Sequence, residues 1–253
     1  MRIDTFLFEK NYFKSRNKAK ESIEKGEVYF DGKIVTKPSF EIPFDTELVS
    51  INRKEKVFVS LGGYKLEKAL SDFDFSVGGL ICADIGASTG GFTDCLLQRD
   101  AKKVYAIDLN DDLLDDELKN DKRVFSIIKN ARDLKREDFT VRPNFIVGDL
   151  SFISLSLIFP IVSNLLDYGE FCLFLIKPQF ELGERKRLKN GIITDDALRK
   201  EIVNKVCGYA VESNFTPVKI TSAPIVKGKN VEYLVLLKKS KTPFNLNEIM
   251  KNL

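Results

Sequence analysis

Histidine is absent from the 253-residue chain, and this absence removes several classes of active site. No Ser-His-Asp triad, no histidine metal ligand and no imidazole base can form. Proton transfer near neutral pH must therefore use carboxylates, lysines, cysteines, tyrosines or water.

Paired cysteines and long apolar runs are lacking as well. None of the four cysteines belongs to a C-x-x-C pair, which argues against a zinc ribbon and a disulfide framework. Free thiols are typical of a reducing compartment, so we expect a cytoplasmic protein without a metal. Charges interrupt the first 25 residues, and the most apolar stretch, 152–166, is too short to span a bilayer. We therefore expect no signal peptide and no membrane insertion.

The overall composition is that of a globular protein. Hydrophobic residues make up 43% and charged residues 30% of the chain, and the net charge of +3 does not by itself identify a nucleic-acid binder. The length accommodates one small and one medium domain, each with its own core.

Residues 1–51 have the pattern of a small α+β domain. An apolar stripe at helical spacing predicts a first helix, and Ser15 is the expected N-cap of a second helix that ends before Gly26. Short strands are predicted at 28–30 and 34–35, around an Asp31-Gly32 hairpin turn, and near 48–51. The apolar stripe consists of Ile3, Phe6, Leu7 and Phe8.

A linker is predicted at 52–59, and from residue 60 to residue 253 strands and helices alternate. The short apolar segments are expected to be buried parallel strands, and two late strands close the sheet. The clearest helix begins after Thr194, its predicted N-cap. We predict a doubly wound α/β domain of the Rossmann-like class. The predicted strands are 80–85, 103–107, 124–128, 145–147, 171–176, 215–220 and 231–237.

The strongest single motif runs from Asp84 to Phe92, between an apolar strand and a helix. Its glycines allow a sharp turn and the close approach of a ligand. A second acid, Asp108, ends the next strand, where a carboxylate can bind ribose hydroxyls. The candidate cofactor-binding residues are Asp84, Gly86, Ser88, Gly90, Gly91, Phe92, Asp108 and Asp149.

Two cofactors fit this layout, and a glycine turn with no ligand is the third interpretation. A dinucleotide would place its pyrophosphate at the helix N-terminus and use a G-x-G-x-x-G pattern, whereas the glycines here are spaced G-x-x-x-G-G. An acid directly before the turn is poorly placed for pyrophosphate. It suits the amino-acid tail and sulfonium of S-adenosylmethionine, which is the favoured cofactor.

Two motifs that the sequence lacks argue against base amino groups and base carbons as the acceptor of the methyl group. The chain has no Pro-Pro, so it lacks the loop common in enzymes that methylate base amino groups, and no cysteine neighbours a proline, as carbon-methylating enzymes of the cytosine type require. The candidate catalytic residues are instead two lysines and two carboxylates, mostly at predicted strand ends. They are Lys65, Asp149, Lys177 and Glu232.

Such a cluster suits methylation of a ribose 2′-hydroxyl, which must lose its proton as it attacks. Lys177 is the candidate base, Lys65 the second cation, and the two carboxylates orient the pair. Taken alone, each of these residues would be interpreted as a solvated surface charge. Their motif contexts together favour the catalytic interpretation.

The same segments resemble the TlyA family of ribosomal RNA 2′-O-methyltransferases, long labelled hemolysins, whose catalytic domain is of the FtsJ type. The segments that carry the resemblance are 59–66, 84–93, 148–155, 177–181 and 230–233. The resemblance implies a Lys-Asp-Lys-Glu tetrad at Lys65, Asp149, Lys177 and Glu232 and a cytidine of ribosomal RNA, or of a ribosomal subunit, as substrate. One departure is Leu61, where the family commonly has arginine.

The N-terminal pattern resembles the α-L RNA-binding domain that a ribosomal small-subunit protein shares with many pseudouridine synthases. Basic residues between Lys10 and Lys25, opposed by Glu21 and Glu24, are either a solvated helix face or phosphate contacts, and the resemblance favours contacts. A second basic run, at 185–189, lies beyond the predicted active edge. The candidate RNA-binding residues are Arg2, Ser15, Arg16, Lys18, Lys20, Lys37, Arg185, Lys186 and Arg187.

Two other functions compete with RNA methylation. A non-enzymatic RNA-binding or ribosome-assembly factor would keep the fold but would not need the four charged residues of the cluster. A membrane-lysing protein, as the family's old label suggests, is disfavoured because neither a signal peptide nor a membrane segment is evident.

Overall fold

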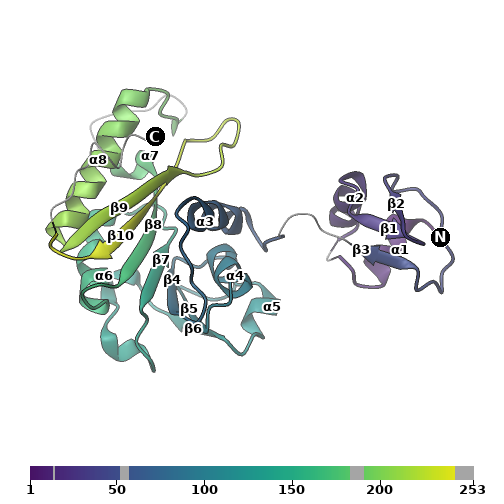
Figure 1. The fold of residues 1–253 in the computed structure, drawn as a ribbon, viewed down its shortest axis with the longest axis horizontal. Coiled ribbons are helices and arrows are strands. Elements are labelled where there is room, and N and C mark those ends of the chain that lie inside the picture. Colours follow the sequence, from purple (N-terminus) through teal and green to yellow (C-terminus); the bar gives the residue numbers. More distant parts are fainter. Residues whose placement is uncertain (14, 52–56, 183–190, 243–253) are drawn as a thin grey trace. The chain divides into compact units, whose positions relative to one another are not determined.

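A computed structural model describes residues 1–13, 15–51, 57–182 and 191–242. The chain divides into two compact units, Met1–Val57 and Phe58–Leu253, and each is described here by itself (Figure 1). Most of the predicted linker, residues 52–56, lies outside the described residues. Phe58 is buried in the second unit, and the Val59 N–H donates to the Asp94 carboxylate at 2.8 Å. The last two residues of the predicted linker thus pack with the second unit.

The first unit consists of two helices and an antiparallel sheet with the strand order β2-β1-β3. Its core draws side chains from both helices and all three strands. The elements are α1 (Ile3–Glu9), α2 (Arg16–Glu24), β1 (Val28–Phe30), β2 (Lys33–Val35) and β3 (Val49–Ile51).

The predicted local signals of this unit are present. Ser15 caps α2, because its hydroxyl accepts from the Lys18 N–H at 3.3 Å, and Gly26 follows the helix with φ +72°. Asp31 and Gly32 both have positive φ, as a tight hairpin turn requires. The prediction was wrong for Phe8, whose side chain is 45% exposed.

The second unit is built on a seven-stranded sheet with the order β6-β5-β4-β7-β8-β10-β9, which confirms the predicted doubly wound α/β class. Strands β4 to β8 are parallel to one another, whereas β10 runs antiparallel to both β8 and β9. The strands are β4 (Ile81–Ile85), β5 (Lys103–Asp108), β6 (Val124–Ile128), β7 (Phe145–Gly148), β8 (Phe171–Ile176), β9 (Phe215–Ser222) and β10 (Tyr233–Lys239).

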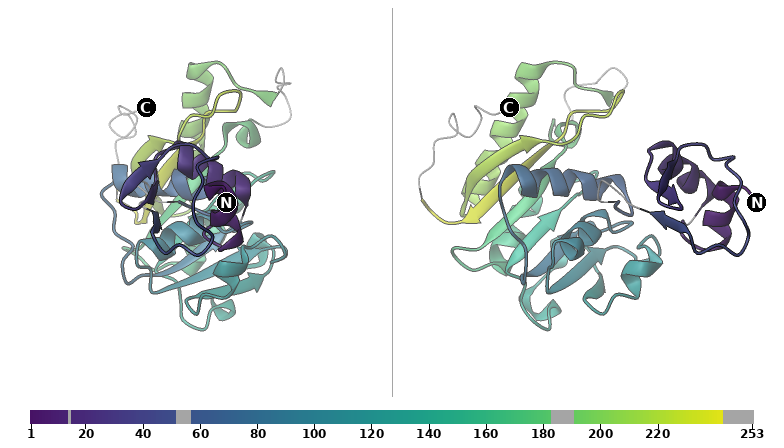
Figure 2. Two further views of the ribbon diagram at one scale, coloured as in Figure 1. Left: turned by 90° about the vertical axis from the view of Figure 1, so that its right-hand side faces the viewer. Right: turned by 45° about the vertical axis from the view of Figure 1, so that its right-hand side comes forward.

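Helices cover both faces of this sheet (Figures 1 and 2). One core cluster joins α3 and α4 to one face, and another joins α6 and α8 to the other, so the strands are apolar on both sides. The helices are α3 (Leu61–Asp72), α4 (Gly91–Gln98), α5 (Asp116–Lys119), α6 (Phe159–Leu165), α7 (Pro178–Glu181) and α8 (Asp196–Glu212), with 3-10 turns at Ala131–Asp133, Arg136–Asp138 and Leu155–Leu157.

Two further details differ from the sequence prediction. Strand β6 was expected to be buried, but it is the edge strand, with Phe125 44% and Ile128 61% exposed. The N-cap of α8 is Asp195 rather than Thr194, because the Asp195 carboxylate accepts from the N–H groups of Ala197 and Leu198. The Asp195 carboxylate thus supplies an acceptor to two N–H groups of the first turn that have no partner within the helix.

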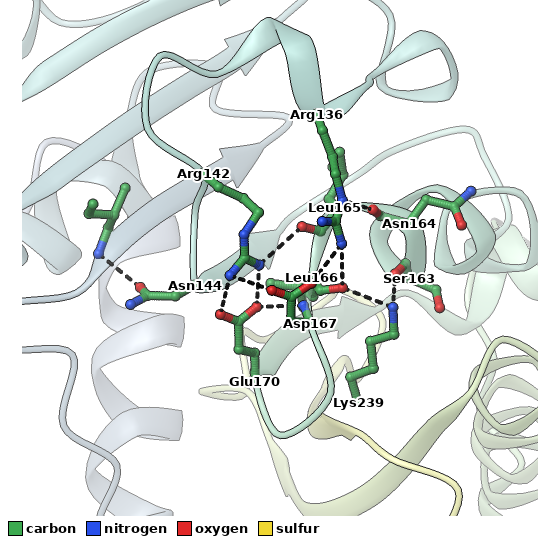
Figure 3. A network of polar contacts seen from close by, with 11 residues as sticks. Arg136, Arg142, Asn144, Ser163, Asn164, Leu165, Leu166, Asp167, Glu170 and Lys239 are labelled. Carbon is green, nitrogen blue, oxygen red and sulfur yellow. Dashed lines mark hydrogen bonds and ion pairs between the residues drawn. The ribbon is translucent and has the colours of Figure 1, made fainter.

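The end of the sheet where β7 and β8 begin carries a network of charged residues, which we call the opposite-edge cluster (Figure 3). Arg136 donates to the carbonyls of Asn164 at 2.6 Å and Leu166 at 3.2 Å, and Lys239 donates to Leu166 at 2.8 Å. These groups cap the C-terminal end of α6, where backbone carbonyls lack helical partners. The cluster consists of Arg136, Arg142, Asp167, Glu170 and Lys239.

Candidate active site

The other end of the sheet, where the parallel strands terminate, gathers most of the predicted site, and we call it the active edge. The turn after β4 places Gly86 and Gly90 in the left-handed region, with φ +84° and +90°. A Cβ on Gly86 would lie 3.1 Å from the Asp149 carbonyl oxygen, and one on Gly90 would lie 2.3 Å from Leu118. Side chains at these two positions would therefore be strained and crowded.

A pocket of about 170 Å³ opens between this turn and the ends of β7 and β8. It brings together six predicted residues: Gly86, Ser88, Gly91, Phe92, Asp149 and Lys177. Prediction did not single out the remaining wall residues, Ser60, Gly62, Ala87, Thr89 and Ser151, although each lies within or next to a motif that it used.

Asp108 lies at the end of β5 and does not line the pocket, but its carboxylate is hydrogen-bonded to Ser88, which does. Its carboxylate accepts from the Ser88 N–H at 2.8 Å and from the Leu109 N–H at 2.7 Å. Each oxygen uses one acceptor position in these bonds and keeps capacity for another donor. The carboxylate is thus oriented by the backbone and suited to ribose hydroxyls.

Asp84 is fully buried beneath the turn and does not line the pocket. One oxygen, Oδ2, accepts from the N–H and the hydroxyl of Thr93 at 2.9 and 2.7 Å, which holds α4 against β4. The other, Oδ1, has no hydrogen-bond partner among the described residues. Burial raises the pKa of Asp84 to about 7, and the nearby carboxylates Asp149 and Asp108 add to the rise.

The orphaned Asp84 oxygen, the strained glycine turn and the oriented Asp108 carboxylate bear on whether the residues fit a cofactor. A buried acceptor without a donor is costly unless a ligand or water supplies one. A cationic amino group and a pair of ribose hydroxyls are the donors that this set would accept. The residues therefore fit S-adenosylmethionine.

The four candidate catalytic residues lie in one connected chain of contacts. Lys65, on α3, contacts the Glu232 carboxylate at 2.6 Å and the Asp149 carboxylate at 3.8 Å. Asp149 follows β7 and contacts Lys177 at 2.6 Å through its other oxygen. The carboxyl ends of β7 and β8 and the start of the antiparallel β10 are adjacent at this edge. Residues far apart in sequence therefore meet there.

Lys177 has a second partner that sequence reasoning missed. Its Nζ donates to the Ser151 hydroxyl at 2.8 Å, and its side chain is 12% exposed. Ser151 lies two residues after Asp149, so the same loop contacts Lys177 twice. The position of Lys177 is thereby fixed at the pocket wall.

Two aromatic residues come from the segments that carry Ser151 and Lys177: Phe152 directly follows Ser151, and Phe180 lies on α7 after Lys177. Phe152 is 89% exposed and adopts φ +63°, a strained conformation for an aromatic residue. Its ring is 4.8 Å from that of Phe180 in a tilted arrangement. A strained and exposed aromatic side chain next to a polar pocket indicates a ligand-contacting role.

Glu181 fastens the loop that carries these groups. Its buried carboxylate accepts from the Leu155 N–H at 2.8 Å and from the Ser154 hydroxyl at 2.6 Å. Helix α7 begins directly after Lys177, and Glu181 is its last residue. Glu181 therefore joins the segment after β8 to the loop after β7. Sequence analysis used this residue as part of a motif without assigning it a role.

In the first unit, two of the predicted RNA-binding arginines converge on one buried acid. Arg2 and Arg16 both donate to the Asp4 carboxylate, at 3.0 and 3.1 Å. Burial alone would raise the pKa of Asp4, but the two guanidinium groups outweigh it and lower the pKa to about 2. Both arginine side chains remain nearly half exposed, so they are oriented while staying accessible.

The other predicted RNA-binding residues differ in what the structure describes. Lys18 and Lys37 are exposed, Lys20 is half-buried, and Ser15 is used as a helix cap. The second basic run and one residue of the first lie outside the described residues: Lys14, Arg185, Lys186 and Arg187.

Two possible features are absent from the described part of the chain. No helix there combines the length and the apolar character needed to cross a membrane. Within the same residues, no group of three or more His, Cys, Asp or Glu side chains could hold a metal ion.

The family model for the FtsJ-like methyltransferase matches residues 58–239, and the model for the S4 domain matches residues 1–48. Hemolysin A of Brachyspira hyodysenteriae is 45% identical over 92% of this chain and 98% of its own length. The 16S/23S rRNA (cytidine-2′-O)-methyltransferase TlyA of Mycobacterium tuberculosis is 36% identical over 94% of this chain and 89% of its own length.

Among solved structures, a protein described as a hemolysin from Streptococcus thermophilus is similar over most of both chains. It is 38% identical, with a TM-score of 0.72 and coverage of 97% of this chain and 90% of that one.

Proposed function

This chain belongs to the FtsJ-like methyltransferase family and carries an S4 domain at its N-terminus, and from this premise we propose that it methylates the 2′-hydroxyl of a cytidine in ribosomal RNA. The observation that carries the proposal is the connected chain Glu232–Lys65–Asp149–Lys177, of which Asp149 and Lys177 line the pocket. The substrate class is the one named for the TlyA relative of Mycobacterium tuberculosis.

The family membership confirms the prediction that S-adenosylmethionine is the cofactor. When bound, S-adenosylmethionine supplies the methyl group, whose bond to sulfur breaks as its bond to the 2′-oxygen forms. In our proposal, Asp108 accepts from the ribose hydroxyls, and the buried Asp84 carboxylate attracts the cationic amino group from beneath the turn. The glycine turn then lets the backbone approach the cofactor closely.

Lys177 is the proposed acceptor of the hydroxyl proton. It is held by Asp149 and Ser151, so its amine is placed rather than mobile, and placement of a base at hydrogen-bond distance is the first requirement of general base catalysis. A lysine must be neutral when it accepts a proton. Lys65 is a second cation that shares the Asp149 carboxylate, and it weakens the hold of that carboxylate on Lys177.

Phe152 gives the site a surface for the target base. Enzymes that modify a nucleotide often take it out of the stack and hold its base against aromatic side chains. Phe152, whose exposed ring contacts Phe180, directly follows Ser151, and the Ser151 hydroxyl accepts from the proposed base Lys177. We propose that the cytosine stacks on this ring while its ribose faces Lys177.

The first unit is the proposed RNA-binding element. The Asp4 carboxylate orients Arg2 and Arg16, and the exposed Lys18 and Lys37 add positive charge. Replacing Lys18 and Lys37 by alanine is expected to weaken RNA binding and to reduce the slope of log affinity against log salt by about 1.4 to 1.8. These two lysines make cleaner variants than Arg16, whose removal would also expose Asp4. An unaltered slope would locate the RNA contacts elsewhere.

The proposed function is tested by methyl transfer in vitro. Ribosomal RNA from cells that lack this protein is incubated with the protein and labelled S-adenosylmethionine, digested to nucleosides and separated. We expect the label in 2′-O-methylcytidine. Label in a base-methylated nucleoside would contradict the proposed acceptor, and RNA binding without any transfer would favour the ribosome-assembly factor.

A further inference from the structure

The connection between β9 and β10 projects from the sheet as a narrow hairpin, visible in yellow-green in Figures 1 and 2. We call residues 224–229 the finger. Its tip exposes two adjacent apolar side chains, Ile225 at 78% and Val226 at 41%. It also carries the exposed lysines Lys227 and Lys229, and no acid lies between Ala223 and Val231.

The finger has a defined structure at its tip and its base. The Lys229 N–H donates to the Val226 carbonyl at 3.1 Å, and Gly228 adopts φ +79°, so the tip is a tight turn. At the base, the N–H of the buried Ala223 donates to the Glu232 carbonyl at 2.8 Å. The turn at the tip and the bond at the base define the backbone path of the finger.

Asn230 fastens the finger from one side. Its amide donates to the Gly191 carbonyl at 2.8 Å and accepts from the Ile193 N–H at 2.8 Å. Two hydrogen bonds from one side chain fix the root of the finger to the segment before α8. An exposed apolar tip on an anchored support indicates a contact with a partner.

The base of the finger is part of the active edge. Glu232, which contacts Lys65 at 2.6 Å, is the last residue before β10, and Tyr233 pairs with Ile176, the neighbour of Lys177. At most about 10 Å of chain separates Lys229 from Glu232. A nucleic acid strand held at the pocket would thus have its flanking nucleotides beside the finger.

The strand order places the finger and Phe152 on two sides of Lys177. Phe152 follows β7, Lys177 follows β8 and the finger precedes β10, and these strands are neighbours in that order. The exposed aromatic ring and the exposed aliphatic tip therefore flank the proposed base. Both are apolar surfaces of the kind that contact nucleobases.

We propose that the finger is an RNA contact of the methyltransferase site, in which Ile225 packs into the base stack next to the target nucleotide while Lys227 and Lys229 contact phosphates. The proposal rests on the proposed function and deepens it, because it names how the target nucleotide is kept out of the stack. Aliphatic side chains are used in this way by other nucleic-acid-binding proteins. The charge of the finger matches RNA.

The experiment compares three variants with the wild-type protein on ribosomal RNA from cells that lack this protein. Ile225→Ser removes the apolar tip, and the double variant Lys227→Ala, Lys229→Ala removes the charge. Val141→Ser is the matched control, because Val141 is 51% exposed and precedes β7 at the opposite edge. All the replaced side chains are exposed, so the fold is not at risk.

We expect Ile225→Ser to lower the single-turnover methylation rate at saturating RNA about tenfold while RNA affinity changes less than about threefold. The double lysine variant should bind more weakly, with a salt slope smaller by about 1.4 to 1.8, the value for two phosphates. Val141→Ser should match the wild type in both measurements.

Two results would overturn the inference: equal rates for Ile225→Ser and Val141→Ser, or an unchanged salt slope in the lysine variant. A wild-type protein that transfers no methyl group to the RNA would refute the proposed function instead, and the salt slope would still decide whether the finger binds RNA. Loss of binding to anionic phospholipid vesicles in the finger variants, with RNA affinity intact, would assign the finger to a membrane.

Discussion

Strands β7, β8 and β10 carry charged residues at both ends, and the two ends are built differently. At the active edge are Asp149, Lys177 and Glu232, joined by Lys65; at the opposite edge are Arg142, Glu170 and Lys239, joined by Arg136 and Asp167. The same three strands therefore support both clusters. The difference shows which features of a charged cluster indicate chemistry and which indicate stability.

The opposite-edge cluster uses arginine in fixed, multiple contacts. Arg142 donates to both oxygens of Glu170, at 2.6 and 2.8 Å, and also contacts Asp167 at 2.9 Å. Bidentate arginine pairs are geometrically specific, and arginine stays protonated at any working pH. Its arginines stabilise the structure but cannot transfer protons.

The active-edge cluster uses lysine, with fewer contacts and a shared carboxylate. Asp149 lies between Lys65 and Lys177 and serves both. Lysine can exchange its proton, and its point charge tolerates small movements. Lysines that share a carboxylate at a pocket therefore indicate chemistry, whereas arginines that saturate carbonyls indicate stability.

The largest effect is expected when Lys177 of the active edge is replaced by arginine, the residue that the opposite edge uses. Lys177→Arg keeps the positive charge but removes a residue that can accept a proton. We expect single-turnover methylation to fall by about 10²–10⁴-fold, while affinities for RNA and S-adenosylmethionine stay near wild type. Rapid-quench kinetics with labelled cofactor measures the rate, and calorimetry measures the affinities. A near-normal rate would make Lys177 a positioning charge, with water as the proton acceptor.

A smaller effect is expected when the same substitution is made at one acid of each edge. Asp108→Ala should weaken S-adenosylmethionine binding by about 1–3 kcal/mol, because a ribose partner is lost and the Ser88 and Leu109 N–H groups are left without it. Asp167→Ala, at the opposite edge, should leave that affinity unchanged. Calorimetry with S-adenosylmethionine and with NAD measures both. Binding of NAD alone would refute the cofactor assignment.

A substitution at the opposite edge is expected to change the stability of the protein and not its methylation rate. Arg142→Ala removes both hydrogen bonds to Glu170 and is expected to lower the free energy of unfolding by about 1–2 kcal/mol, since the pair is partly exposed. Urea denaturation measures this loss. The methylation rate of the folded variant should equal that of the wild type, and a large fall in rate would show that the two edges are coupled.

A further comparison concerns how stability changes with pH at the two edges. Burial raises the pKa of Asp84 to about 7, so its contribution to stability is present below about pH 4 and is lost as the pH rises toward 7. The hydrogen bond from Arg136 lowers the pKa of Asp167, so its contribution is present above about pH 4 and is lost as the pH falls.

Asp84→Asn removes the first of these two titrations and can be tested by denaturation between pH 4 and pH 8. The stability of the wild type should decline relative to this variant as the pH rises, by at most about 1.4 kcal/mol per pH unit. A difference that is constant with pH would show that Asp84 does not titrate in this range.

The sequence predicted the active edge better than the opposite edge, and the reason is physical. Parallel strands end at the same edge, so motifs that follow Gly148 and Ile176 had to meet there, and Asp149 and Lys177 lie in contact. The partners at the opposite edge, such as Arg142 and Glu170, are far apart in sequence and belong to no motif. Neither helix periodicity nor strand alternation indicates such a pair.

Other features depend on tertiary packing that a single sequence does not reveal. Asp84 was placed at the cofactor on the strength of its motif, yet one of its oxygens bonds Thr93 beneath the turn. The positive φ of Phe152 and the hydrogen bond from Lys177 to Ser151 are set by the loop that Glu181 fastens. An apolar segment such as β6 is exposed because it lies at the sheet edge.

The most direct test of the central claim is to map 2′-O-methyl groups on ribosomal RNA from cells that lack this protein and from the same cells supplied with the wild type, Lys177→Arg or Arg142→Lys. We predict one or more cytidines that are methylated with the wild type and with Arg142→Lys, and left unmethylated without the protein and with Lys177→Arg. Full methylation with Lys177→Arg, or a methylation map that does not change when the protein is removed, would contradict the account.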